Sequence, residues 1–140
     1  MQAKSAIKEV YRDRFGVLLE DSGSRLLELR WQEGSAAMTD DDFRAWLERY
    51  AAEAEARRPA NLLIDVTQFR HRPGAEVAPW RDTHIIPRYN RAGVKKFAFL
   101  LPPGSPGTAS AGNQPEPEPP GTFPTGYFDD RGQIDEWFSS

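Results

Sequence analysis

The sequence predicts an α/β domain: a mixed sheet of four to five strands with an antiparallel N-terminal hairpin, parallel central strands and helices packed on it. Two segments, 61–67 and 95–101, are apolar at consecutive positions, which is typical of central strands covered on both faces. A helical pattern lies between them, and parallel neighbouring strands need such a crossover. The chain has 140 residues, so we expect one domain.

The N-terminal segment has apolar residues at helical spacing, including Ala3, Ile7, Val10 and Tyr11. We therefore expect an amphipathic helix over residues 3–13. This assigns residues 1–14 to an N-terminal helix or arm and residues 15–140 to the single domain.

A hairpin is expected over residues 15–31, because apolar residues alternate on both sides of the turn-forming Asp21–Ser24. A helix then starts at Thr39, whose hydroxyl can cap it with Asp42 as the capping-box partner. The pattern Arg57-Arg58-Pro59 ends this helix. Its aromatic stripe is interpreted as core.

After the first central strand, a loop over residues 68–75 precedes a helix that begins near Glu76 and ends at Ala92-Gly93. Pro87 lacks an amide donor and disfavours the helical conformation at the residue before it, so we expect a kink or break there. The Pro-rich loop at 102–124 holds eight of the twelve prolines, and we interpret it as a lid or an extended, unstructured insertion. A short strand at Tyr127-Phe128 and a final helix complete the chain.

Composition excludes several classes of function. The sequence has no cysteine, no apolar run long enough for a membrane span, and no phosphate-loop, dinucleotide or hydrolase-elbow motif. We therefore expect a cytoplasmic protein without cofactor, metal or membrane span, and its net charge of −3 argues against nucleic-acid binding. Residues 70–96 nevertheless carry a net charge of +5, so the remainder carries −8. Such a basic face could attract an anion, or it could simply be solvated.

The order of these elements resembles the STAS-like fold of anti-sigma-factor antagonists, and more narrowly the SpoIIAA-like (STAS/SEC14-type) group of small bacterial proteins. The resemblance rests on the following segments: Leu62–Thr67, Trp80 with Ile86-Pro87, Ala92–Phe99, Tyr127–Asp130, and Trp137-Phe138. It implies a small non-catalytic module that acts through protein–protein regulation or binds an apolar ligand. Antagonists of this family carry a phosphorylatable serine after the central strand, whereas Phe69–Gly74 contains no hydroxyl. A serine-phosphorylation switch is therefore not expected.

Ligands often bind at the carboxyl ends of parallel strands. The candidate ligand-binding residues near this edge are Asp65, Thr67, His71, Arg72, Trp80, His84 and Arg88. Three functions stay open. The first is a regulatory module with an unknown protein partner or a homodimer. The second is a carrier of a small anionic or lipid-like ligand, with an apolar pocket beside the Trp80 helix and a basic rim of Arg72 and Arg88. The third is an enzyme that uses Asp65, His71 and His84. A structural role for these side chains is the alternative to all three.

Overall fold

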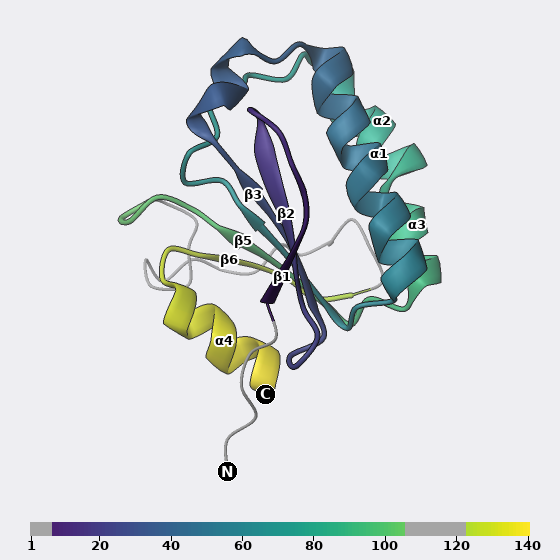
Figure 1. Ribbon diagram of the computed structural model, residues 1–140, viewed down its shortest axis with the longest axis vertical. Coiled ribbons are helices and arrows are strands. Elements are labelled where there is room, and N and C mark those ends of the chain that lie inside the picture. Colours follow the sequence, from purple (N-terminus) through teal and green to yellow (C-terminus); the bar gives the residue numbers. More distant parts are fainter. Residues whose placement is uncertain (1–6, 106–122) are drawn as a thin grey trace.

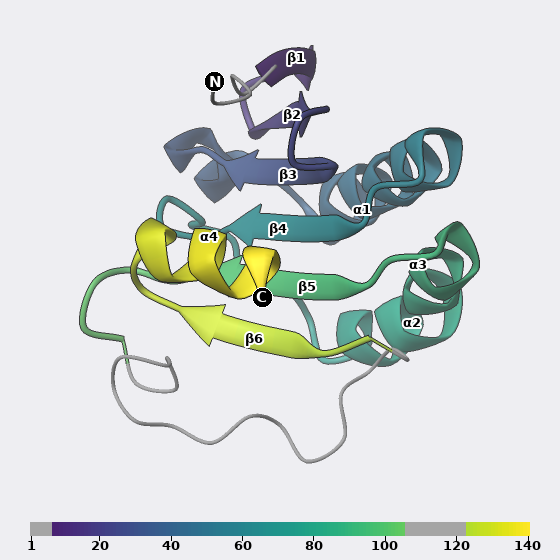
Figure 2. The same ribbon diagram turned by 90° about the horizontal axis from the view of Figure 1, so that it is seen from below.

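The computed structural model describes residues 7–105 and 123–140 and contains a six-stranded mixed sheet, with the strands in sequence order from one edge to the other. The strands are β1 (Ile7–Arg12), β2 (Gly16–Asp21), β3 (Leu26–Trp31), β4 (Asn61–Asp65), β5 (Lys96–Leu100) and β6 (Thr125–Phe128). The first three are antiparallel, and β3 through β6 are parallel. Figure 2 shows the strands stacked in this order. The α/β class is therefore confirmed, and the expected four to five strands were too few.

The helices are α1 (Asp40–Arg57), α2 (Val77–His84), α3 (Ile86–Ala92) and α4 (Arg131–Ser139), and a short 3-10 helix, η1, spans Glu33–Ala37. Helices α1, α2 and α3 lie on one side of the sheet and α4 on the other (Figure 1). The connections from β3 to β4 and from β4 to β5 place their helices on the same face of the sheet. They do so because both connections have the same handedness and both lead to the next strand in the same direction across the sheet. We call this the helix face, and the opposite side the α4 face.

The expected helix over residues 3–13 was wrong for its described part, because Ile7–Arg12 form strand β1. A β-bulge between Glu9 and Tyr11 explains the misleading pattern. An extra residue in the strand moves the odd-numbered side chains from one face to the other. Ile7 lies opposite Asp21 on the α4 face, whereas Tyr11 packs on Trp46 on the helix face, with ring centroids 5.3 Å apart. The apolar residues 7, 10 and 11 therefore imitate helical spacing.

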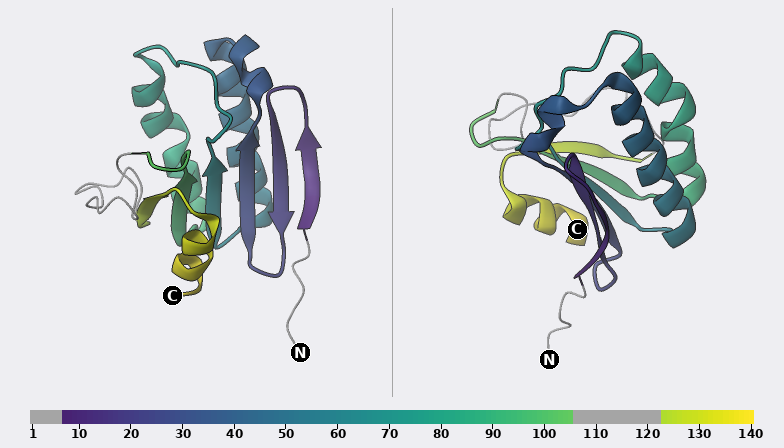
Figure 3. Two further views of the ribbon diagram at one scale, coloured as in Figure 1. Left: turned by 90° about the vertical axis from the view of Figure 1, so that its left-hand side faces the viewer. Right: turned by 45° about the horizontal axis from the view of Figure 1, so that its top comes forward.

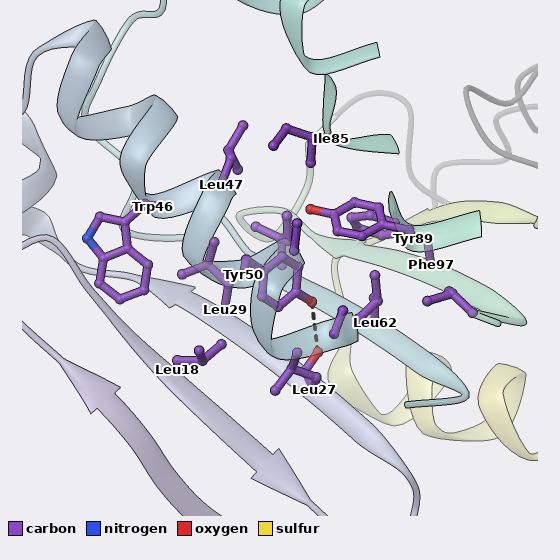
Figure 4. Packing of buried hydrophobic residues seen from close by; sticks show 14 of the residues in the cluster. Leu18, Leu27, Leu29, Trp46, Leu47, Tyr50, Leu62, Ile85, Tyr89 and Phe97 are labelled. Carbon is purple, nitrogen blue, oxygen red and sulfur yellow. Dashed lines mark hydrogen bonds between the residues drawn. The ribbon is translucent and has the colours of Figure 1, made fainter. Parts of the chain in front are cut away.

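The start of α1 is as expected. Thr39 Oγ1 accepts a hydrogen bond from the Asp42 amide, and Asp42 Oδ2 accepts one from the Thr39 amide, at 3.1 and 2.9 Å. This capping box satisfies two amides that the first turn leaves free. The helix then buries one stripe, in which Tyr50 is fully buried and its hydroxyl lies 2.8 Å from the Leu27 carbonyl oxygen (Figure 4). Burial raises the pKa of Tyr50 well above its ordinary value.

The helical segment before β5 breaks where Pro87 predicted. Helix α2 ends at His84, and α3 begins at Ile86 with Pro87 in its first turn. Gly93 ends α3 in the left-handed conformation, with φ at 86°, which glycine adopts without strain. Most of the Pro-rich loop at 102–124, which was expected to be a lid or an unstructured insertion, lies outside the described residues.

Helix α4 packs on the part of the sheet formed by β4, β5 and β6. It buries Ile134 against a small second core of Leu63, Ala98, Leu100 and Phe128. On this face no helix of the described residues covers β1, β2 and β3, as the left view of Figure 3 shows. The sheet is therefore covered on both faces at its parallel side and on one face at its antiparallel side.

Candidate functional site

A cavity of about 390 Å³ lies between the helix face of the sheet and helices α1, α2 and α3. Its sheet side is formed by Ile64, Val66, Phe97, Phe99, Thr125 and Tyr127. Its helix side is formed by Phe43, Leu47, Arg81, Asp82, Ile86 and Tyr89. The volume falls within the range of about 300–1,000 Å³ that is usual for small-molecule sites. Its lining, mainly apolar with few polar groups, is also typical of such sites.

Strand geometry explains why the sheet side is aromatic. Side chains alternate between faces, so Phe97 and Phe99 point to the helix face, and the parallel register places Thr125 and Tyr127 beside them. The rings of Phe97 and Phe99 stack with centroids 4.8 Å apart, and Phe99 stacks on Tyr127 at 5.2 Å. One side of the cavity is therefore a row of near-parallel rings.

A second aromatic cluster borders the cavity from β3, α1 and the loop after β4. Trp31 stacks on Phe43 with ring centroids 5.5 Å apart, and Phe69 lies 5.1 Å from Trp31. All three residues line the cavity. Because β4 lies between β3 and β5, Ile64 of β4 and Val66, which directly follows the strand, form the part of the lining between the two aromatic clusters.

Two residues on the sheet side of the cavity carry a hydroxyl group, the partly buried Tyr127 and the buried Thr125. Thr125 has 7% of its surface exposed, and its Oγ1 has no hydrogen-bond partner among the described residues. Buried hydroxyl groups are nearly always paired, because leaving one unpaired costs about 1–3 kcal/mol. An unpaired hydroxyl on a residue that lines an apolar cavity is thus consistent with a ligand group that would pair with it.

The charged side chains among the described lining residues are Arg81 and Asp82, both on α2. Asp82 Oδ1 accepts hydrogen bonds from Arg81 Nε and Nη2 at 3.2 and 3.0 Å. Both side chains are partly exposed, at 39% and 50%. The pair therefore marks the solvent side of the cavity and adds no net charge to it.

The loop that carries Phe69 is held at two points. The hydroxyl of Ser35, a fully buried residue, accepts a hydrogen bond from the Arg70 amide at 2.8 Å. His71 Nε2 lies 2.9 Å from Asp40 Oδ1, and Asp40 also accepts from the Gly74 amide. The His71 hydrogen bond is the main cause that lowers the pKa of Asp40 below its ordinary value. These contacts fix Phe69 against the cavity.

The candidate residues from the sequence do not form one site. Asp65 and Thr67 lie together: Asp65 Oδ1 accepts from the Thr67 amide at 2.9 Å and from its hydroxyl at 2.6 Å. The Asp65 side chain belongs to the α4 face, where Arg131 donates to it at 3.4 Å and to Glu28 at 2.8 Å. The bond to Glu28 is the main cause that raises the pKa of Arg131. Asp65 is thus one of two buried carboxylates in an ionic cluster with the partly exposed Arg131.

The other candidates lie on the helix side of the sheet, at separate places. His71 contacts Asp40 and the rings of Phe43 and Phe69, as described above. The rings of Trp80 and His84 stack along α2 at 5.8 Å, and His84 is exposed. Arg72 is exposed in the loop before α2.

Arg88 binds α1 instead of the cavity. Its Nη2 donates to Glu55 at 2.6 Å and its Nη1 to Glu48 at 3.2 Å. The hydrogen bond to Glu55 is the first cause that raises the pKa of Arg88 and lowers that of Glu55. The basic segment before β5 is thus partly neutralised by acidic residues of α1. Arg72 and Arg88 were expected to form a basic rim of the apolar pocket, but the charged residues among the described lining of the cavity are Arg81 and Asp82.

Sequence reasoning did not single out Thr125, Phe99 or Tyr127 as site residues. Phe97 and Phe99 were placed in a central strand, but the neighbouring strand β6 was expected to contain only Tyr127 and Phe128. Thr125 was therefore not expected to lie in a strand, and no face of the sheet could be predicted for it. Of the described residues, none form a cluster of three or more His, Asp or Glu side chains suited to a metal ion.

The chain was compared with family models, with curated proteins and with solved structures, and no match was found in any of the three. In the part of the chain that the structure describes, no helix is both long and apolar enough to cross a bilayer.

Proposed function

We propose that this protein binds a small, mainly apolar ligand in the cavity between the sheet and helices α1 to α3. The observation that carries the proposal is the apolar cavity of about 390 Å³, one of whose lining residues, Thr125, has a buried and unpaired hydroxyl. Apolar contact would supply most of the binding free energy, at about 25 cal/mol per Å² of apolar surface removed from water. The hydroxyl would supply orientation.

The proposal is tested by blocking the cavity. Val66 is part of the lining, so Val66→Phe should fill the space with a ring. Ile7→Phe is the matched control, because it also adds a ring but at an exposed position on the other face of the sheet. Native mass spectrometry of each purified protein reports any bound mass, and ligand-observed NMR reports binding of two apolar probes, naphthalene and decanol. Thermal unfolding confirms that each variant is folded.

We expect the wild type and Ile7→Phe to bind at least one apolar probe, and Val66→Phe to lose at least tenfold in affinity. Failure of the folded wild type to bind either probe would refute the proposal. Equal binding by the wild type and Val66→Phe would place the ligand elsewhere and would refute it as well.

A second candidate, a regulatory module that acts through protein contacts, is favoured by the open α4 face of β1 to β3. Ile7 lies there on an edge strand with 66% of its surface exposed. The edge strand β1 presents backbone N–H and C=O groups with which a strand of another chain could pair. The STAS-like relationship is part of this candidate and is supported by the order of elements from β3 to α4. Light scattering after size exclusion tests the homodimer: a monomer at high concentration would refute it.

A further inference from the structure

We propose that the ligand of this cavity is an uncharged planar aromatic molecule that carries one hydroxyl or carbonyl group. The inference rests on the proposed function and names the ligand class for that site. Three properties of the lining support it: the aromatic clusters at both ends, the unpaired hydroxyl of Thr125, and the mutual neutralisation of the charged side chains.

The shape of the lining favours a ring over an acyl chain. Phe97, Phe99 and Tyr127 form one cluster of stacked rings, and Trp31 and Phe43 belong to the other. Aromatic rings gain about 0.5–1.5 kcal/mol per pair beyond burial of area when they meet in stacked or edge-to-face geometry. A planar ligand between the clusters can make such contacts with both. An acyl chain cannot make them, and it loses more conformational freedom on binding.

The size of the cavity limits the ligand to about one or two fused rings. A volume of about 390 Å³ corresponds to about a dozen groups of the size of a water molecule, at about 30 Å³ each. A ligand with about ten to fifteen non-hydrogen atoms would fill it.

Thr125 determines where the oxygen atom of the ligand lies. The residue stands opposite Phe97 in the parallel register, so an oxygen that reaches it belongs to a ring placed on the Phe97 side of the cavity. A threonine hydroxyl both donates and accepts, so a ligand hydroxyl or carbonyl can pair with it. Oγ1 is itself buried, and a rotation of χ1 to another staggered position would turn it toward the ligand without movement of the backbone.

The charges exclude an ionised ligand from the buried part of the cavity. Among the described lining residues, Arg81 and Asp82 are the charged ones, and they are hydrogen-bonded to each other. A carboxylate beside Thr125 would therefore be buried without a free cation, which is strongly unfavourable. The site should accept a phenol or an aromatic ketone and reject the corresponding carboxylate.

The test uses the full chain and four probes: naphthol, naphthalene, decanol and naphthoate. Naphthalene lacks the oxygen, decanol has as many non-hydrogen atoms as naphthol without a ring, and naphthoate adds a charge. Affinities are measured by calorimetry and ligand-observed NMR for the wild type and for Thr125→Val, in which a methyl replaces the hydroxyl. Thr67→Val is the matched control, because its hydroxyl is bonded to Asp65 on the other side of the sheet.

We expect the wild type to bind naphthol about tenfold more tightly than naphthalene, the fold-change for one good hydrogen bond. Decanol and naphthoate should bind at least tenfold more weakly than naphthol. Thr125→Val should reduce the affinity for naphthol about tenfold and leave naphthalene unchanged, whereas Thr67→Val should change neither. If decanol binds as well as naphthol, or if Thr125→Val has no effect, the aromatic inference is refuted while the proposed function stands. If no probe binds, both fail.

Discussion

Replacement of Thr125 by valine should stabilise the protein, which is unusual for a substitution in a buried strand. Threonine and valine have the same shape and both favour strands, so packing changes little. The substitution removes a buried oxygen that has no hydrogen-bond partner in the described part of the chain, a state that costs about 1–3 kcal/mol. We therefore expect the free energy of unfolding to rise by about 1–2 kcal/mol.

For a domain of this size, 1 kcal/mol corresponds to about 3–4 °C in Tm. Urea unfolding followed by tryptophan fluorescence, together with calorimetry, measures both quantities in protein freed of ligand. Thr67→Val is the control with the opposite expected sign, because it removes a hydroxyl that donates to Asp65 at 2.6 Å. A Thr125→Val protein that is less stable than the wild type would show that the hydroxyl is paired in solution and would refute the reasoning.

Three further predictions concern the core, the ionic cluster and the loop. Tyr50→Phe should lower the free energy of unfolding by about 1–3 kcal/mol in urea, because it removes the hydroxyl beside the Leu27 carbonyl oxygen. Arg131→Met should lower the free energy of unfolding by about 1–3 kcal/mol, which is less than for a fully buried ion pair because Arg131 is 40% exposed. A double-mutant cycle with Glu28→Gln measures the coupling energy between Arg131 and Glu28. The pKa of Asp40 is lower in the folded protein than in the unfolded chain, so ionised Asp40 stabilises the fold fully above about pH 4, and this contribution is lost as the pH falls further. Asp40→Asn should therefore flatten the acid part of the curve of stability against pH.

Each of these predictions has an outcome that would contradict it. An unchanged stability of Tyr50→Phe would mean that the Leu27 carbonyl group finds another donor. A coupling energy near zero in the cycle would mean that Arg131 leaves Glu28 in solution. An acid limb that is the same in Asp40→Asn and the wild type would show that other carboxylates govern it.

Local sequence determined several elements of this fold because each depends on nearby residues alone. Thr39 and Asp42 form the capping box of α1, and Pro87 separates α2 from α3, both as the sequence indicates. The uninterrupted apolar residues of β4 and β5 likewise predicted central strands, which the parallel register confirms. Turn, cap and periodicity patterns are local, so they need no knowledge of the rest of the chain.

The candidate site was less accessible to sequence reasoning, because it depends on which face each strand presents. Asp65 and His71 are close in sequence, yet Asp65 belongs to the cluster of Arg131 on the α4 face, whereas His71 binds Asp40 beside α1. Arg88 was expected at a rim, but it lies beside Glu55 and Glu48 because α3 packs along α1. Charges separated by more than thirty residues are paired by packing, and no local pattern reports such pairing.

The sequence by itself determined the α/β class, the start of α1, the break at Pro87 and the two central strands, because hydrophobic periodicity and capping act over a few residues. The tertiary structure alone decided that β1 is a bulged strand and that Phe99, Tyr127 and Thr125 meet across two strands. Register and face are properties of strand pairing, and a shift of one residue would reverse every side chain. The cavity, and with it the proposed ligand, exists because that pairing places rings and an unpaired hydroxyl on one side of the sheet.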